Sequence, residues 1–286
     1  AALCLPLVTV MIFSVLPIIF MILIAFTNLG GDIVYPRLAD WSFSAWKKIF
    51  SVGKLGSTFG KILTWNVLWA VITTAINFLC GLGLALLLNS KIRGRNVFRA
   101  IIYLPALVAP VIMGTMYYFI FQYQQGALNT IMIGLGFEKV AWFNNPAVSV
   151  AIITIVNSIQ FVGVSMIIYL AGLQTLDQSV MEAASLDGAS GWKKFWNITL
   201  PMLQPAFTTS VVLNLIGGLK LFDIIKVLTN GGPGYATNSI STYISSMYFD
   251  AQNAGYASAL GVFLFILIAI ITYLLNTGLA KLNWEA

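Results

Sequence analysis

Residues 147–205 read AVSVAIITIVNSIQFVGVSMIIYLAGLQTLDQSVMEAASLDGASGWKKFWNITLPMLQP and join a long apolar segment to a polar one. Residues 147–173 carry no charge and exceed the roughly 20 residues that a helix needs to cross a bilayer. Residues 174–202 are much more polar, and Leu200-Pro201 marks the return to an apolar segment. The stretch therefore predicts two membrane-spanning helices that are connected by an ordered polar loop.

Six apolar segments of this kind predict an all-α membrane protein with six transmembrane helices, formed by residues 1–286 as a single domain. They lie near 3–27, 62–89, 100–121, 147–173, 203–219 and 256–280. The first could be mistaken for a secretion signal. Its uncharged length, and the absence of a small-residue cleavage site at Asn28-Leu29-Gly30, favour a true span.

The composition supports a lipid-facing surface. Hydrophobic residues make up 59% of the chain and charged residues only 8%, whereas soluble domains carry about 25% charged residues. The net charge of +6 does not indicate nucleic acid, because the densest basic cluster (Lys91, Arg93, Arg95 and Arg99) flanks a predicted span. We therefore expect a multi-pass protein of the plasma or inner membrane, in contact with lipid and not with nucleic acid.

Catalytic and metal-binding chemistry is disfavoured. The chain has no histidine, which is the usual general base and the commonest metal ligand. Its two cysteines, Cys4 and Cys80, both lie within apolar runs. We therefore predict no catalytic residue, no cofactor-binding residue and no metal site.

The basic loop at 90–98 is expected to face the cytoplasm, which places residues 174–202 on the same side. The loop at 28–61 then lies outside, although it is also basic. Within it, Trp41, Phe43, Trp46 and Phe50 recur at helical spacing, which is typical either of a helix at the membrane interface or of a packing segment.

Two short helices are expected in the polar loop. Asp177 can cap a helix that runs through Glu182 to Leu186, and Asp187-Gly188 can form a turn in which glycine takes a positive φ. A second short helix fits residues 191–197. On composition alone, this segment could be a docking element or an ordinary structured loop.

A resemblance favours the docking element. The motifs Glu182-Ala183-Ala184 and Asp187-Gly188-Ala189, followed by Ile198, Leu200-Pro201 and Pro205, resemble the cytoplasmic signature loop of binding-protein-dependent ABC importer permeases. In that family the loop forms coupling helices that insert into the ATPase subunit. The resemblance implies that the coupling contacts here are Glu182, Ala183, Ala184, Asp187 and Gly188.

Further motifs resemble the carbohydrate-uptake branch of these permeases, and in particular the larger permease subunit of maltose transporters. They are Tyr103-Leu104-Pro105, Leu173-Gln174, Phe222-Asp223 and Leu228-Thr229-Asn230-Gly231-Gly232-Pro233. The chain departs from the family at Gly217-Gly218-Leu219, where polar or aromatic residues are common. The resemblance implies alternating access with a second homologous permease, two ATPase subunits that bind ATP and Mg²⁺, and an extracellular solute-binding protein.

A solute path is predicted from polar and aromatic residues within the fourth and fifth spans, because buried polar groups need a cavity or a partner helix. Amides can bind sugar hydroxyls, and aromatic rings can cover the apolar face of a sugar. The candidates are Asn157, Gln160, Phe161, Asn214, Gly218 and Phe222; for each of them, hydrogen bonding between helices is the alternative. Lys220 and Asp223 are expected to form an i, i+3 ion pair.

The function expected is the import of an oligosaccharide or a related sugar. A glycerol phosphoester or a sugar alcohol is the alternative solute, since importers of these share the pattern. An ion-coupled transporter is disfavoured because the middle of the spans lacks ionisable residues. An intramembrane enzyme is disfavoured by the lack of histidine and of paired carboxylates.

Overall fold

The computed structural model describes residues 4–30, 41–51, 58–90 and 92–280, and these form an array of helices. Apart from an isolated β-bridge between Thr27 and Trp41, the described residues contain no β-structure. The all-α prediction is therefore confirmed.

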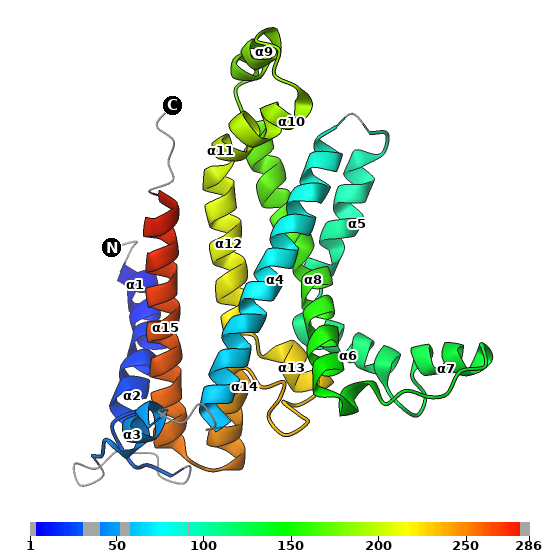
Figure 1. Cartoon of the computed structure of the whole chain (residues 1–286). Helices are drawn as coiled ribbons and strands as arrows, with labels where there is room; N and C mark the ends of the chain where they lie inside the picture. Colours follow the sequence, from blue (N-terminus) through cyan, green and yellow to red (C-terminus); the bar gives the residue numbers. More distant parts are fainter. Residues whose placement is uncertain (1–3, 31–40, 52–57, 91, 281–286) are drawn as a thin grey trace.

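Three helices form the centre of the molecule: α4 (Thr58–Asn89), α8 (Pro146–Gln174) and α12 (Gln204–Leu219) (Figure 1). Small residues bring them close together. A Cβ atom added to Gly81 of α4 would lie 2.7 Å from Cβ of Ser165 on α8. A Cβ added to Gly172 of α8 would lie equally close to Cβ of Ala206 on α12. Glycine is therefore needed where these helices touch.

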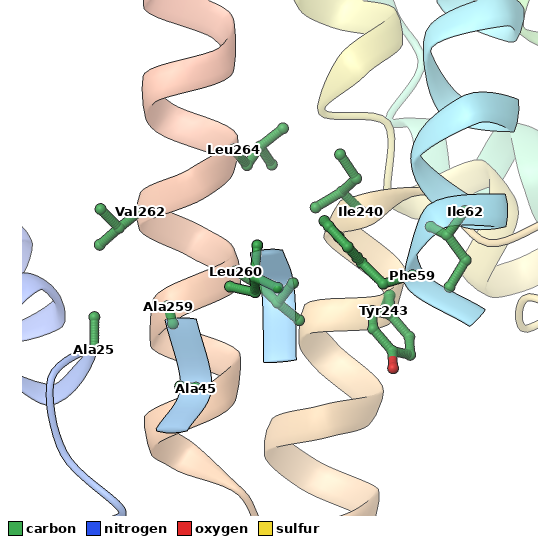
Figure 2. Close-up of a cluster of buried hydrophobic side chains, with 11 residues drawn as sticks. Ala25, Ala45, Phe59, Ile62, Ile240, Tyr243, Ala259, Leu260, Val262 and Leu264 are labelled. Carbon is green, nitrogen blue, oxygen red and sulfur yellow. The ribbon is translucent and has the colours of Figure 1, made fainter. Parts of the chain in front are cut away.

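A second group of helices flanks this centre. The first apolar segment forms α1 (Cys4–Val10), a π-helical turn η1 (Met11–Val15) and α2 (Leu16–Ile24), and α2 packs against the last helix, α15 (Ala254–Ala280). Figure 2 shows Leu260 and Leu264 of α15 on the side that faces Ile240 and Phe59. The short helix α3 (Ser44–Phe50) buries Ala45 and Ile49 in this cluster. It therefore packs along one face and exposes Phe50 on the other.

The third predicted span is broken. Its two parts, α5 (Arg95–Leu107) and α6 (Pro110–Phe121), meet at an angle of 95°. Pro110 is the first residue of α6, where its missing N–H costs no hydrogen bond. The Nε2 atom of Gln160 on α8 donates to the carbonyl oxygen of Val108 at 2.9 Å and so satisfies a backbone group at the break. Beyond α6 lie α7 (Ala127–Gly134) and a 3-10 turn, η3 (Trp142–Asn144).

The count of six spans is not confirmed. Four of the described helical segments are long and apolar enough to cross a membrane, and the bent pair makes a fifth if it counts as one. The fifth predicted span, 203–219, forms α12, whose 16 residues are shorter than a full crossing requires. The remaining bounds agree with the prediction to within a few residues.

The short elements gather at the two ends of the array (Figure 1). At one end lie α9 (Gln178–Leu186), α10 (Gly191–Lys194), the π-helical turn η4 (Phe195–Thr199) and α11 (Leu200–Met202), near the connection between α4 and α5. At the other end lie α13 (Asp223–Leu228), α14 (Ile240–Ser245) and the π-helical turn η5 (Ser246–Asp250). The two loops that were predicted to be cytoplasmic thus share one end.

Candidate functional site: a cavity between α8 and α12 and an exposed loop

A cavity of about 280 Å³ lies between α8 and α12, next to the short helix α13. Its wall is mainly apolar, with amide, aromatic and charged side chains among the lining residues. These residues are Pro110, Asn157, Phe161, Val164, Ile168, Leu213, Asn214, Gly217, Gly218, Lys220, Leu221, Phe222 and Asp223.

Five of the six residues predicted for a solute path line this cavity: Asn157, Phe161, Asn214, Gly218 and Phe222. Gln160 does not. Its side chain is fully buried and is used to hold the break between α5 and α6 through Val108. Gln160 lies three residues after Asn157 on α8. Its side chain binds Val108, at the break between α5 and α6, and does not line the cavity.

The side chain of Asn157 lines the cavity and has no hydrogen-bonding partner in the described part of the chain. Asn157 is 5% exposed, and its side chain makes no hydrogen bond to any residue that the structure describes. A polar group in an apolar span needs a hydrogen-bonding partner. Phe161 follows one turn later on the same helix and also lines the cavity. Asn157 and Phe161 are therefore placed to offer an amide and a ring to a bound molecule.

Asn214 lines the same cavity, but its amide is already used between helices. Its Oδ1 accepts from Nδ2 of Asn77 on α4 at 2.7 Å. Its Nδ2 donates to Oγ of Ser165 on α8 at 2.8 Å and to the carbonyl oxygen of Ser210 at 2.8 Å. The bonds to Asn77 and Ser165 join α12 to α4 and α8. The amide of Asn214 therefore forms hydrogen bonds between helices, which was the alternative to a role in the solute path.

Gly218 serves close packing at the edge of the cavity. A Cβ atom there would lie 2.9 Å from Cα of Ala70 on α4. The carbonyl oxygen of Gly218 accepts a hydrogen bond from Nδ2 of Asn66, at 3.4 Å. Sequence reasoning did not single out Asn66, which also accepts from the backbone N–H of Ile240 and so ties α4 to the start of α14.

The expected ion pair between Lys220 and Asp223 is not formed. The i, i+3 rule requires a continuous helix, but α12 ends at Leu219 and α13 begins at Asp223. The two residues therefore flank a break, and within the described chain neither side chain has a hydrogen-bonding or ion-pair partner. Both line the cavity.

The exposed loop has the two features predicted for it. The carboxylate of Asp177 caps α9 by accepting from the backbone N–H of Ser179 at 2.9 Å. This hydrogen bond, together with a weaker contribution from the Ser179 hydroxyl, lowers the pKa of Asp177. Gly188 follows α9 with a φ of +76°, in the left-handed region that favours glycine.

Four of the predicted coupling residues lie on the outside of this loop: Glu182, Ala183, Asp187 and Gly188. Ala184 is buried, at 7% exposed, and its carbonyl oxygen accepts from the N–H of Ala189, so it supports the turn from inside. The two most exposed large apolar side chains of the loop were missed. Leu186 is 89% exposed and Trp192 is 72% exposed. Their apolar character within a polar segment was the signal available in the sequence.

A lysine joins the two short helices of the loop. The Nζ atom of Lys194, at the end of α10, donates to the carbonyl oxygen of Met181 at 2.5 Å and to Oγ of Ser185 at 2.9 Å. Both acceptors belong to the last two turns of α9, where the partial negative charge of the helix end favours a cation. Lys194 thereby fixes the position of α9 relative to α10.

Long apolar helices, a mainly apolar cavity with a few polar side chains between two of them, and an exposed loop that connects the same two helices are typical of a polytopic membrane transport protein. The family described as "Binding-protein-dependent transport system inner membrane component" matches residues 77–282. The chain belongs to this family. It is therefore a multi-pass permease component of an ABC importer, located in the inner or plasma membrane.

Individual relatives extend the match. The trehalose/maltose transport system permease protein MalF of Thermococcus litoralis is 35% identical over 207 residues, which are 72% of this chain and 70% of the relative. The arabinooligosaccharides transport system permease protein AraP of Bacillus subtilis is 30% identical over 267 residues, 92% of this chain and 82% of the relative. The sulfoquinovosyl glycerol transport system permease protein SmoG of Agrobacterium fabrum is 35% identical over 210 residues, 73% of this chain and 68% of the relative.

Among solved structures, a chain of the bacterial ABC transporter involved in the import of the acidic polysaccharide alginate has a TM-score of 0.82. It is 23% identical, and the match covers 98% of this chain and 94% of that chain. This likeness shows that the two share a fold.

Proposed function

We propose that this chain carries an oligosaccharide or a related sugar through the membrane, and that the cavity between α8 and α12 holds the solute. The unpartnered amide of Asn157 in that cavity carries the proposal. A bound hydroxyl group would supply the hydrogen bond that no described residue provides.

The chemistry of the wall supports a sugar. A carbohydrate ring needs hydrogen-bonding groups around its edge and an apolar surface against its face. Asn157 supplies the first, and Phe161 and Phe222 supply the second. The relatives named for maltose and arabinooligosaccharides support the same class of solute.

The two helices that form the cavity also lead to the exposed loop. On α8, Asn157 lies about 25 Å from the end of the helix at Gln174, at a rise of 1.5 Å per residue. A tilt of α8 and α12 would therefore move the loop and the cavity wall together. We infer that the loop at 174–202 docks on an ATPase subunit through Glu182, Ala183, Asp187 and Gly188, with Leu186 and Trp192 in the contact.

In this proposal the chain works in an assembly. A second homologous permease completes the solute path, and two ATPase subunits bind ATP and Mg²⁺ and perform the hydrolysis. A solute-binding protein delivers the sugar from outside. Closure of the ATPase dimer would draw the coupling loops together and open the cavity outward, so that the loop and the cavity bias one two-state element.

The test is uptake by the complete complex in proteoliposomes. We expect ATP-dependent uptake of an oligosaccharide that requires the binding protein. Phe161→Ala should weaken the uptake of a sugar more than that of a glycerol phosphoester, because only the sugar ring has an apolar face to stack. Phe161→Leu, which keeps much of the apolar volume but has no ring, is the matched control for lost volume.

Equal loss for both solutes in Phe161→Ala would contradict the stacking role. Uptake of a glycerol phosphoester or a sugar alcohol, without any uptake of sugar, would establish the alternative solute. Uptake that is driven by an ion gradient in the absence of ATP would contradict the proposal of ATP-driven import.

A further inference from the structure

A second, more open hollow of about 590 Å³ lies at the end of the molecule opposite the exposed loop, where α6 and α13 end (Figure 1). Its volume falls within the range of about 300–1,000 Å³ that is usual for small-molecule sites. We call it the α6–α13 hollow. One wall consists of Tyr118, Gln122, Tyr123, Gln124 and Phe143, and the other belongs to the segment 227–233.

The first wall has the chemistry of a sugar site. The rings of Tyr118 and Phe143 stack at 6.3 Å with an interplanar angle of 10°, and so form a flat aromatic surface. The side-chain amide of Gln122 and the hydroxyl of Tyr123 make no hydrogen bond to any described residue, so both are free to bind a ligand. None of the described residues that line the hollow is charged. Hydroxyl groups and an apolar ring face therefore suit this wall.

A buried amide fixes the shape of this wall. Asn129 is 1% exposed, and its Nδ2 donates to the carbonyl oxygens of Tyr123 at 3.2 Å and of Val140 at 2.9 Å. Its Oδ1 accepts from the N–H of Val140 at 3.0 Å and from Nε1 of Trp142 at 3.2 Å. Asn129 thus ties the chain at Tyr123 to the chain beside Phe143. A site that is already formed loses less conformational entropy when it binds.

The opposite wall is held in a similar way. The hydroxyl of Thr237 donates to the carbonyl oxygen of Gly232 at 2.7 Å and lies 2.7 Å from the hydroxyl of Thr229. This wall contains most of the Leu228–Pro233 motif, which resembles the carbohydrate-uptake branch as a whole. It therefore cannot distinguish this chain from other members of the branch, and the inference depends on the side chains of the first wall.

Two helices connect the α6–α13 hollow to the solute cavity. Pro110 at the start of α6 lines the cavity, and Gln122 directly after α6 lines the hollow. On α13, Asp223 lines the cavity and Val227 lines the hollow, about 6 Å further along at a rise of 1.5 Å per residue. Because α6 and α13 pack against each other, the two sites lie along one pair of helices.

We propose that the α6–α13 hollow is a second sugar subsite, which binds one residue of an oligosaccharide while another residue occupies the cavity between α8 and α12. This inference rests on the proposed function and adds the length of the solute to it. A sugar short enough to fill the cavity alone gains nothing from the hollow. A longer sugar gains hydrogen bonds from Gln122 and Tyr123, so the chain favours longer oligosaccharides.

The experiment compares maltose with maltopentaose, and arabinobiose with arabinopentaose, since relatives are named for both kinds of sugar. Uptake by the complete complex is measured against the concentration of loaded binding protein. Equilibrium binding of the free sugars to the purified permease–ATPase complex, without the binding protein, gives a second readout. The variants are Gln122→Ala and Tyr123→Phe. Gln125→Ala is the matched control, because Gln125 is an exposed amide on the same turn that does not line the hollow.

We expect Gln122→Ala to weaken the binding of the five-residue sugar by about two- to tenfold, as for the loss of one hydrogen bond, and to leave the two-residue sugar unchanged. Tyr123→Phe should act in the same direction, since it keeps the ring and removes only the hydroxyl. Gln125→Ala should change neither sugar. Assembly should be normal in all three, because none of the removed groups has a hydrogen-bonding partner among the described residues.

Unchanged binding of the five-residue sugar in both variants would overturn the inference. So would a half-saturation that rises equally for both lengths while binding of the free sugars stays the same, since the hollow would then contact the binding protein instead. Either result leaves the proposed function standing, because sugar is still taken up. Absence of ATP-dependent uptake of all four sugars by the unmodified complex would instead overturn the proposed function, and the inference with it.

Discussion

The side-chain amide of Asn77 donates to Oδ1 of Asn214 at 2.7 Å, which links α4 to α12 across a separation of 137 residues. The Nδ2 atom of Asn214 in turn donates to Oγ of Ser165 on α8. The half-buried amide of Asn214 thus joins the three central helices beside the cavity. Asn157, which lies on the same cavity, makes no such bond in the described structure. Asn157 and Asn214 were both predicted to line the solute path, but only the amide of Asn214 is hydrogen-bonded to other helices in the described structure.

Asn77→Ala should reduce the stability of the assembled complex and leave the half-saturation of uptake unchanged. The change removes one hydrogen bond and leaves Oδ1 of Asn214 without its partner, at a cost of about 1 kcal/mol. The measurements are the melting temperature of the purified complex and its uptake kinetics. A raised half-saturation with normal stability would instead place Asn77 on the solute path.

Asn157→Ala should give the opposite pattern. The loss of a hydrogen bond to a neutral hydroxyl costs about 0.5–1.5 kcal/mol, so half-saturation should rise by a few-fold to roughly tenfold. Stability and assembly should stay normal, because the amide has no partner to lose among the residues that the structure describes. Binding of a labelled sugar to the purified complex checks this expectation. Unchanged affinity would remove Asn157 from the solute site.

Gly81→Ala should loosen the contact between α4 and α8. The added Cβ would lie 2.7 Å from Cβ of Ser165, the residue that Asn214 binds. Overpacking of this kind costs about 1–3 kcal/mol. Gly83→Ala is the matched control, since a Cβ at Gly83 meets no atom within 4 Å. Thermal unfolding should show a lower melting temperature for Gly81→Ala than for Gly83→Ala. Equal melting temperatures would show that α4 and α8 can move apart at Gly81 without loss of stability.

The sequence predicted the long helices well because their boundaries depend on local chemistry. Residues 147–173 were expected to span the membrane, and α8 covers Pro146–Gln174. The cap at Asp177 and the positive φ of Gly188 were predicted for the same reason, since each depends on a neighbour within a few residues.

Features that depend on distant residues were not predictable in this way. The prolines of the third span were visible, but the 95° bend also involves Gln160, which binds Val108 from 52 residues away. The fifth span was predicted to end at Leu219, as α12 does, but the break between Lys220 and Asp223, which separates the expected ion pair, was not predicted. The role of Asn214 depends on Asn77, which no local pattern connects to it.

Gly188→Ala should uncouple ATP hydrolysis from uptake. The residue has a φ of +76°, and a Cβ there meets no atom within 4 Å, so the cost comes from backbone conformation alone. That cost is about 1–2 kcal/mol, which the loop can avoid by turning α9 away from its position. Gly191→Ala is the control, because Gly191 has equal space and no positive φ. Similar ratios of solute taken up to ATP hydrolysed in both variants would contradict a special role for Gly188.

Lys194→Met should have a related effect through a different contact. The side chain of Met is similarly long and flexible but cannot donate, so the bonds to the carbonyl oxygen of Met181 and to Ser185 are lost. The last turns of α9 then lose the cation that favours their free carbonyl groups. We expect α9 to move more freely against α10, and the number of solute molecules taken up per ATP hydrolysed to fall several-fold.

Lys193→Met is the matched control for this change, because the neighbouring Lys193 is exposed and its side chain makes no hydrogen bond in the described structure. Lys194→Arg should retain most of the coupling, since arginine keeps the charge and several donors. Proteoliposomes that report ATP hydrolysis and uptake together provide the measurement, and subunit content by gel filtration shows whether the complex has assembled. Equal uptake per ATP hydrolysed in Lys194→Met and Lys193→Met, measured in intact complexes, would show that the bonds of Lys194 do not contribute to coupling. The position of α9 would then have to depend on its contact with the ATPase subunit.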